Sequence, residues 1–177
     1  ADNYQHLNFL DNAIAETHRA LALNPKLGRA YAVQAQAYDK MKKTAEAEAA
    51  FAKAIEFEPE DQNLRYQRGM FYRQKKRYKA AIADLSEAIK LNNKSEIYFC
   101  ARGSALVSDG QYEKAIADCT RSLQLNSNRT HPYFSRGIAY RKLGKHQLAV
   151  KDFDEAINMY PRYGEAFYER SQVYRAM

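Results

Sequence analysis

The chain has 177 residues, of which 46% are hydrophobic and 28% are charged, so it can bury a core and is not a disordered segment. Seven glycines and four prolines are too few for the many turns of an all-β protein, and the abundance of Ala, Lys, Glu, Leu and Arg favours helix. Two cysteines cannot form a disulfide framework, no apolar run reaches the roughly 18–20 residues that span a bilayer, and a net charge of +7 allows only mild attraction to acidic partners.

These properties leave the compartment open. No basic-then-apolar leader opens the sequence, and free thiols slightly favour the cytoplasm. A leader that had been removed would leave no trace, so a signal peptide is not excluded and the localisation is unknown.

The sequence repeats itself in steps of 34. The stretch RGMFYRQKKRYKAAIADLSEAI at 68–89 shares nine of 22 positions with RGIAYRKLGKHQLAVKDFDEAI at 136–157, which starts two such steps later. Five sets of positions recur in this register: Ala35, Gly69, Gly103, Gly137 and Ser171; Ala13, Ala47, Ala81, Ala115 and Ala149; Ala20, Ala54, Ala88, Ser122 and Ala156; Tyr4, Tyr38, Tyr72, Leu106, Tyr140 and Tyr174; and the breakers Pro25, Pro59, Asn93, Ser127 and Pro161. Such self-similarity indicates a repeat array.

Each unit is predicted to be a pair of antiparallel helices. Helical spacing i, i+4, i+7, i+8 is seen in Ala81, Leu85, Ala88 and Ile89. A turn between the two helices is permitted near the middle of most units by Lys76, Gly110 and Gly144, and the breakers end each second helix.

The predicted elements in chain order form a single array. Residues 1–27 are a partial repeat, expected to contain the end of a first helix and a complete second helix. Four complete repeats follow at 28–61, 62–95, 96–129 and 130–163, and residues 164–177 form a first helix without its partner.

This pattern resembles the tetratricopeptide repeat, a helix–turn–helix unit of about 34 residues, over essentially the whole chain. The resemblance implies an all-α fold, a right-handed superhelical solenoid of stacked antiparallel helix pairs. It also implies a non-enzymatic protein-binding scaffold without cofactor or metal, whose partner is a protein or peptide segment rather than a small-molecule substrate. The concave wall of such a solenoid is lined by first-helix residues.

An arginine recurs where the repeat template usually has an apolar residue, and an aspartate follows it at i+16. The two positions are about equally far from the turn, so antiparallel packing should bring them together, and the arginine fork suits a carboxylate. We predict three structural ion pairs that join helix to helix: Arg68–Asp84, Arg102–Asp118 and Arg136–Asp152. The first full repeat has Gln34 and Ala50 instead, and Arg170 is expected to lack such a partner.

The positions that line the concave wall in the family are carried over one by one. They hold Arg29, Ala32, Val33, Gln36, Asn63, Tyr66, Gln67, Met70, Arg73, Ile97, Cys100, Ala101, Ser104, Val107, His131, Phe134, Ser135, Ile138, Arg141, Glu165, Tyr168, Glu169 and Gln172. The groove-binding candidates among them are Arg29, Tyr66, Met70, Arg73, Ile97, Ser104, Phe134, Ile138, Arg141 and Tyr168. The apolar members are interpreted as anchors that solenoid packing does not demand, although several could touch the next unit.

The ligand expected from this wall is an extended or helical segment with apolar anchors and, in one version, an acidic residue for Arg73 or Arg141. Family members that bind chaperones hold a terminal carboxylate with Lys, Asn and Arg at set positions. No three consecutive units supply that set here; Ala32, Gln36 and Gln67 stand at three of the places. A carboxylate-clamp ligand is therefore not expected.

Two alternatives stay open. The segment 73–79, RQKKRYK, could join Lys40, Lys42, Lys43, Arg141, Lys142 and Lys145 in a basic edge that binds RNA or an anionic membrane, although a solvated rim explains it more simply. The half-repeats at both ends should expose apolar surface, of which Phe167, Val173, Tyr174 and Met177 are examples, so the chain could be part of a larger array or associate with another copy. The four histidines occupy unlike repeat positions, and Cys100 and Cys119 are interpreted as small hydrophobes.

Overall fold

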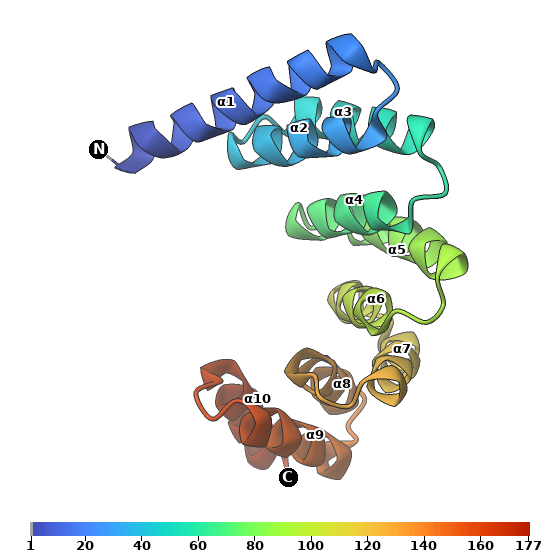
Figure 1. Cartoon of the computed structure of the whole chain (residues 1–177). Helices are drawn as coiled ribbons and strands as arrows, with labels where there is room; N and C mark the ends of the chain where they lie inside the picture. Colours follow the sequence, from blue (N-terminus) through green and yellow to red (C-terminus); the bar gives the residue numbers. More distant parts are fainter. Residues whose placement is uncertain (1) are drawn as a thin grey trace. The chain divides into compact units, whose positions relative to one another are not determined.

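The computed structural model of the chain (Figure 1) describes residues 2–177, with side chains from residue 9 onward, so Tyr4 of the apolar register lies outside the described side chains. The described part of the chain contains helices and no strands, which confirms the all-α prediction. Their bounds are α1 (Asp2–Leu23), α2 (Gly28–Lys40), α3 (Thr44–Phe57), α4 (Gln62–Gln74), α5 (Tyr78–Leu91), α6 (Glu96–Ser108), α7 (Tyr112–Leu125), α8 (Thr130–Lys142), α9 (His146–Met159) and α10 (Gly164–Ala176). Among these helices none is both long and apolar enough to cross a bilayer.

The start of the chain differs from the sequence prediction. Residues 2–23 form the single continuous helix α1, so the expected end of a first helix followed by a separate second helix is wrong. Continuing an existing helix adds one backbone hydrogen bond per residue, and the chain runs through these residues without a turn. The later part of α1 keeps the register of a second helix, because Ala13 and Ala20 precede Ala47 and Ala54 by one repeat length.

Each first helix from α2 to α8 ends in the same tight turn. The second residue after the helix end adopts a positive φ at Lys42 (62°), Lys76 (59°), Gly110 (79°) and Gly144 (70°). The following amide donates to a carbonyl in the last turn of the helix, as Lys145 N does to Tyr140 O at 2.9 Å. This is a Schellman cap, which ends a helix by satisfying its last carbonyls and reverses the chain.

The described chain divides into two compact units, Ala1–Phe71 and Tyr72–Met177, with the boundary inside α4. In the first unit α2 packs on both α1 and α3, around a core of Ala32, Ala54, Ile55 and Leu64. In the second unit α5 to α10 pack in chain order. Its cores are formed by Leu106, Ala115 and Ala139, and by Ala149, Phe153 and Val173.

Small residues lie where two helices approach most closely. A Cβ added at Gly103 would stand 2.7 Å from Cys119 Sγ, and one added at Gly137 would stand 2.8 Å from Phe153 Cε1. Both glycines belong to the small-residue register read from the sequence. The register therefore marks places where the backbone of a first helix meets a side chain of its second helix.

Candidate functional site

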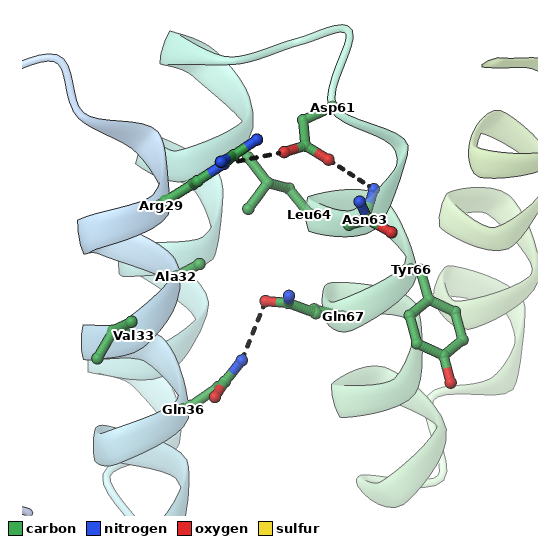
Figure 2. Close-up of a pocket in the computed structure, with 9 residues that line it drawn as sticks. All are labelled: Arg29, Ala32, Val33, Gln36, Asp61, Asn63, Leu64, Tyr66 and Gln67. Carbon is green, nitrogen blue, oxygen red and sulfur yellow. Dashed lines mark hydrogen bonds and ion pairs between the residues drawn. The ribbon is translucent and has the colours of Figure 1, made fainter. Parts of the chain in front are cut away.

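A hollow of about 520 Å³ lies between α2 and α4 in the first unit (Figure 2). It is lined by Arg29, Ala32, Val33, Gln36, Asp61, Asn63, Leu64, Tyr66 and Gln67. Apart from Asp61, which directly precedes α4, every lining residue stands on a first helix. The hollow is therefore built from first-helix positions, as the concave wall of a helical-repeat protein would be.

The hollow combines an apolar floor with an amide rim. Ala32 and Leu64 are 4% and 2% exposed and close the floor, whereas Val33 is 45% exposed. Across the hollow Gln36 Nε2 donates to Gln67 Oε1 at 3.0 Å, as Figure 2 shows. The Asp61 carboxylate accepts a hydrogen bond from the backbone N–H of Asn63 at 2.8 Å, which fixes the start of α4. Such a surface offers a place for an apolar side chain beside groups that both donate and accept hydrogen bonds.

The charge at one end of the hollow is balanced within the unit. Arg29 Nε lies 3.6 Å from Asp61 Oδ2 and 3.7 Å from Glu58 Oε2, so one cation faces two carboxylates. The Arg29 side chain is 77% exposed, which leaves these contacts screened by solvent. The end of the hollow at Arg29 therefore does not present an uncompensated positive charge. Tyr66 points to the side of α4 away from α2 in Figure 2 and is half-buried.

The wall residues of the second unit divide into exposed and packed ones. Ile97 on α6 and Tyr168 on α10 are 40% and 63% exposed. Phe134 and Ile138 are half-buried and pack against the core of Ala149, Phe153 and Val173. The expectation that solenoid packing does not demand Phe134 and Ile138 is therefore wrong: both cover the core where α8 meets α9.

Two predicted wall cations already have partners in the second unit. Arg141 Nε lies 2.8 Å from Glu169 Oε2, an ion pair in which both side chains are mostly buried. Arg73 Nη1 donates to Ser104 Oγ at 3.2 Å, and its buried Nε has no hydrogen-bond partner among the described residues. Arg141 is thus balanced by a carboxylate, whereas the partner of Arg73 is a hydroxyl. Met70 is half-buried in α4.

The repeated arginines hold their helices through two-pronged bonds. Arg102 donates from Nε and Nη2 to Asp118 at 2.6 and 2.8 Å. Arg136 donates in the same way to Asp152, at 2.8 Å from each nitrogen. Arg68 is half-buried and Asp84 is 5% exposed; they belong to different units, so their pairing stays a prediction.

Sequence reasoning missed a second partner of each arginine, which stands at i−16. Arg102 Nη1 donates to Ser86 Oγ at 3.0 Å, and Arg136 Nη1 donates to Thr120 Oγ1 at 2.9 Å. Each arginine thus ties its own second helix to that of the preceding repeat. The available signal was a polar residue two places after each aspartate, in steps of 34: Ser86, Thr120 and Asp154.

The same signal accounts for a partner of Arg170 that the i+16 pattern does not include. Its Nη1 bonds to Asp154 on α9, which stands at i−16 like Ser86 and Thr120 in the two earlier cases. Arg170 therefore has an aspartate partner, although not in the direction that the sequence pattern suggested.

Burial shifts the pKa values of one aspartate and of both cysteines. Burial raises the pKa of the Asp152 carboxyl, and hydrogen bonds from Arg136 oppose that rise. Burial also raises the pKa of Cys100 to about 11 and raises that of Cys119, so neither thiol is an activated nucleophile. Among the described residues no cluster of His, Cys, Asp and Glu is arranged to hold a metal ion.

The fold and the hollow define the class as helical-repeat proteins built from paired helices. Family models described as "Tetratricopeptide repeat" match residues 32–96, 98–129 and 132–163. The chain belongs to the tetratricopeptide repeat family. A comparison with curated protein sequences found no match.

Solved structures with the same fold include YrrB, MamA and a domain of human RPAP3. YrrB, described as a tetratricopeptide repeat protein with an unusual peptide-binding site, is 22% identical with a TM-score of 0.80, over 96% of this chain and 88% of that one. MamA is 22% identical with a TM-score of 0.78, over 93% and 96% of the two chains. The second repeat domain of human RPAP3, solved with the HSP70 peptide SGPTIEEVD, is 24% identical with a TM-score of 0.59, over 63% and 97%. At these identities the similarity establishes the tetratricopeptide fold.

Proposed function

We propose that the chain is a non-enzymatic scaffold that binds a segment of another protein on its first-helix wall. The observation that carries the proposal is the hollow between α2 and α4, where an apolar floor is bordered by amide side chains. The peptide-binding descriptions of YrrB and of the RPAP3 domain support a role of this kind. Binding of a segment by such a wall requires neither cofactor nor metal.

The chemistry of the hollow favours an uncharged, extended ligand segment. A small or medium apolar side chain fits against Ala32, Val33 and Leu64, where it removes apolar area from water. Gln36 and Gln67 can exchange their mutual hydrogen bond for bonds to the ligand main chain, since an amide both donates and accepts. Main-chain bonds with side-chain pockets are a common mode of peptide recognition.

The charges argue against a ligand held by its terminal carboxylate. Arg29 already faces Asp61 and Glu58, so an added carboxylate at that end would meet two like charges. The positions of a carboxylate clamp hold Ala32, Gln36 and Gln67. A segment with an apolar anchor therefore fits this hollow better than an acidic terminus.

The second unit, taken by itself, supplies candidates for a separate contact with a partner segment. Ile97 and Tyr168 are exposed apolar residues on first helices, and exposed aromatic residues often contribute strongly at interfaces. Arg73, with its Ser104 partner, is the better candidate for an acidic ligand residue, because Arg141 would first have to leave Glu169. These contacts extend the proposal beyond the hollow and can be tested separately.

The experiment starts from peptides selected for binding to the intact chain from a displayed random library, with affinities measured by calorimetry. Val33→Asp should weaken the selected peptides by about 10–100-fold, because it places an uncompensated charge against an apolar ligand side chain. The matched control is Leu23→Asp, which changes an exposed aliphatic residue outside the hollow. Equal effects of the two variants, or no effect of either, would refute binding at the hollow.

Salt dependence separates this proposal from the basic-edge alternative. Apolar and main-chain binding should change little between low and moderate salt, whereas a phosphate binder loses affinity steeply as counterions compete. A steep loss for RNA or anionic vesicles, together with no selectable peptide, would favour the basic edge.

A further inference from the structure

Arg73 differs from the other half-buried arginines of the second unit, because no carboxylate of the described residues lies within ion-pair distance of it. Its Nη1 donates to Ser104 Oγ at 3.2 Å, and its buried Nε has no hydrogen-bond partner among the described residues. A hydroxyl leaves the charge of a guanidinium unbalanced, so an anion is the group that would complete this contact. The other half-buried arginines of the unit do pair with a carboxylate: Arg102 with Asp118, Arg136 with Asp152, Arg141 with Glu169, and Arg170 with Asp154.

The repeat register shows which anion stands beside an arginine at this position. Arg141 follows Arg73 by two repeat lengths, and its Nε lies 2.8 Å from Glu169 Oε2. The residue that precedes Glu169 by two repeat lengths is Ala101, which is 7% exposed and carries no charge. The earlier repeat therefore keeps the cation of this pair and has lost its carboxylate.

The surroundings of Arg73 leave its charge uncompensated. Arg73 and Arg129 both act on the Cys100 thiol, where they oppose the rise of its pKa to about 11 that burial causes. Arg129 is itself balanced, because its Nη2 lies 2.7 Å from Glu96 Oε1. The net charge of +7 comes entirely from the second unit, since the first unit holds about as many Asp and Glu as Lys and Arg. Charge complementarity at this wall therefore favours an acidic partner.

An exposed apolar residue lies on the same face of α6 as Ser104. Ile97, Cys100 and Ser104 follow one another at i, i+3 and i+7, which places them along one side of the helix. Ile97 is 40% exposed. The helical rise separates Ile97 from Ser104 by about 10 Å, which an extended segment covers in about three residues.

We propose that the second unit binds a partner segment that carries an Asp or Glu about three positions from an apolar residue. The ligand carboxylate binds the Arg73 guanidinium as Glu169 binds Arg141, and the Ser104 hydroxyl, which both donates and accepts, bonds to it as well. The apolar ligand side chain covers Ile97. This inference rests on the proposed scaffold function and adds a contact separate from the hollow.

The test uses peptides from a displayed random library, selected on the intact chain and counter-selected against Arg73→Glu, with affinities measured by calorimetry. The remaining peptides should share an Asp or Glu about three positions from an apolar residue. They should bind Arg73→Glu about tenfold or more weakly, because that variant opposes like charges. Exchanging the shared acidic residue for Lys should restore binding to Arg73→Glu. The matched control is Arg121→Glu, which changes an exposed cation on α7 and should leave the affinities unchanged.

A second variant leaves Arg73 in place and supplies the missing carboxylate from within the chain. Ala101→Glu places a glutamate at the register of Glu169, so it should compete with the peptide and weaken binding by about tenfold or more. Ala101→Gln fills the same space without a charge and should weaken binding much less. Circular dichroism and the urea midpoint of each variant show that the fold is kept.

Several results would overturn the proposal: no peptide left after counter-selection, remaining peptides without a shared acidic residue, equal losses for Arg121→Glu and Arg73→Glu, or equal losses for the two Ala101 variants. RNA or anionic vesicles that bind through Arg73 while acidic peptides do not would overturn it in favour of phosphate. The hollow is tested independently, because none of the changed residues lines it. Peptides that respond to Val33→Asp but not to Arg73→Glu would support the hollow and remove the Arg73 contact, and the reverse pattern would do the opposite.

Discussion

Gly137→Ala tests the close approach of α8 and α9. The new Cβ would lie 2.8, 3.0 and 3.1 Å from Cε1, Cδ1 and Cζ of Phe153. Unstrained carbon atoms prefer separations of about 3.5–4.0 Å, so the ring or the helix must move by about half an ångström or more. Phe153 is 0% exposed and packs against Ala149 and Val173, so it has little room to move.

Two opposing effects set the magnitude. Overpacking of a filled core costs about 1–3 kcal/mol, and exchanging glycine for alanine inside a helix returns about 0.8–1.0 kcal/mol. The free energy of unfolding should therefore fall by up to about 2 kcal/mol. The matched control is Gly164→Ala in α10, where an added Cβ meets nothing within 4 Å; its free energy of unfolding should stay equal or rise slightly.

The assay is urea unfolding followed by helix circular dichroism, with the slope m compared between variants. The double variant Gly137→Ala/Phe153→Leu should lose less stability than the two single variants lose in sum. The smaller leucine side chain relieves the contact with the new Cβ. If Gly137→Ala is more stable than the wild type at unchanged m, as an unhindered exchange of glycine for alanine would be, the proposed close approach is wrong.

Three further predictions concern single side chains. Lys76→Gly should stabilise the chain by about 0.5–1 kcal/mol in the same urea assay, because Lys76 holds a φ of 59° that glycine adopts without steric cost; a lower midpoint would argue against this. Glu96→Gln should lower stability at neutral pH, since a hydrogen bond from Arg129 lowers the pKa of Glu96 from its ordinary 4.5. The unfolded chain then binds that proton more tightly than the native one, so this contribution is present above pH 4.5 and is lost as the pH falls; a wild-type advantage that persists in strong acid would contradict it. In the native chain at about pH 8, Cys100 and Cys119 should react with a thiol reagent much more slowly than in urea, because burial raises both pKa values; rapid labelling of both native thiols would disprove this.

The repeat register predicted much of the architecture because it fixes which positions must be small. Gly110 and Gly144 marked turns that need a positive φ, and the same register extends to Lys42, whose side chain gives no such hint. Position alone, rather than residue type, identifies that turn. The repeat register therefore predicts this turn although the residue type does not.

What the sequence did not reveal depends on contacts across repeats. The backward bonds of the arginines were missed because a serine, a threonine and an aspartate share one role there, at Ser86, Thr120 and Asp154. Phe134 and Ile138 were interpreted as ligand anchors, although their position on the wall also lets them reach the core. The continuous helix α1 could not be foreseen, because the repeat pattern specifies the register of positions but not whether a turn interrupts the helix.

The most direct test of peptide recognition by the first-helix wall is an amide chemical-shift titration of the labelled chain with a selected peptide. We predict that the largest shifts fall on α2 and α4, at Ala32, Val33, Gln36, Leu64 and Gln67, with small changes on α3. Shifts centred on α3, or spread evenly over the basic turn residues, would contradict recognition at the hollow.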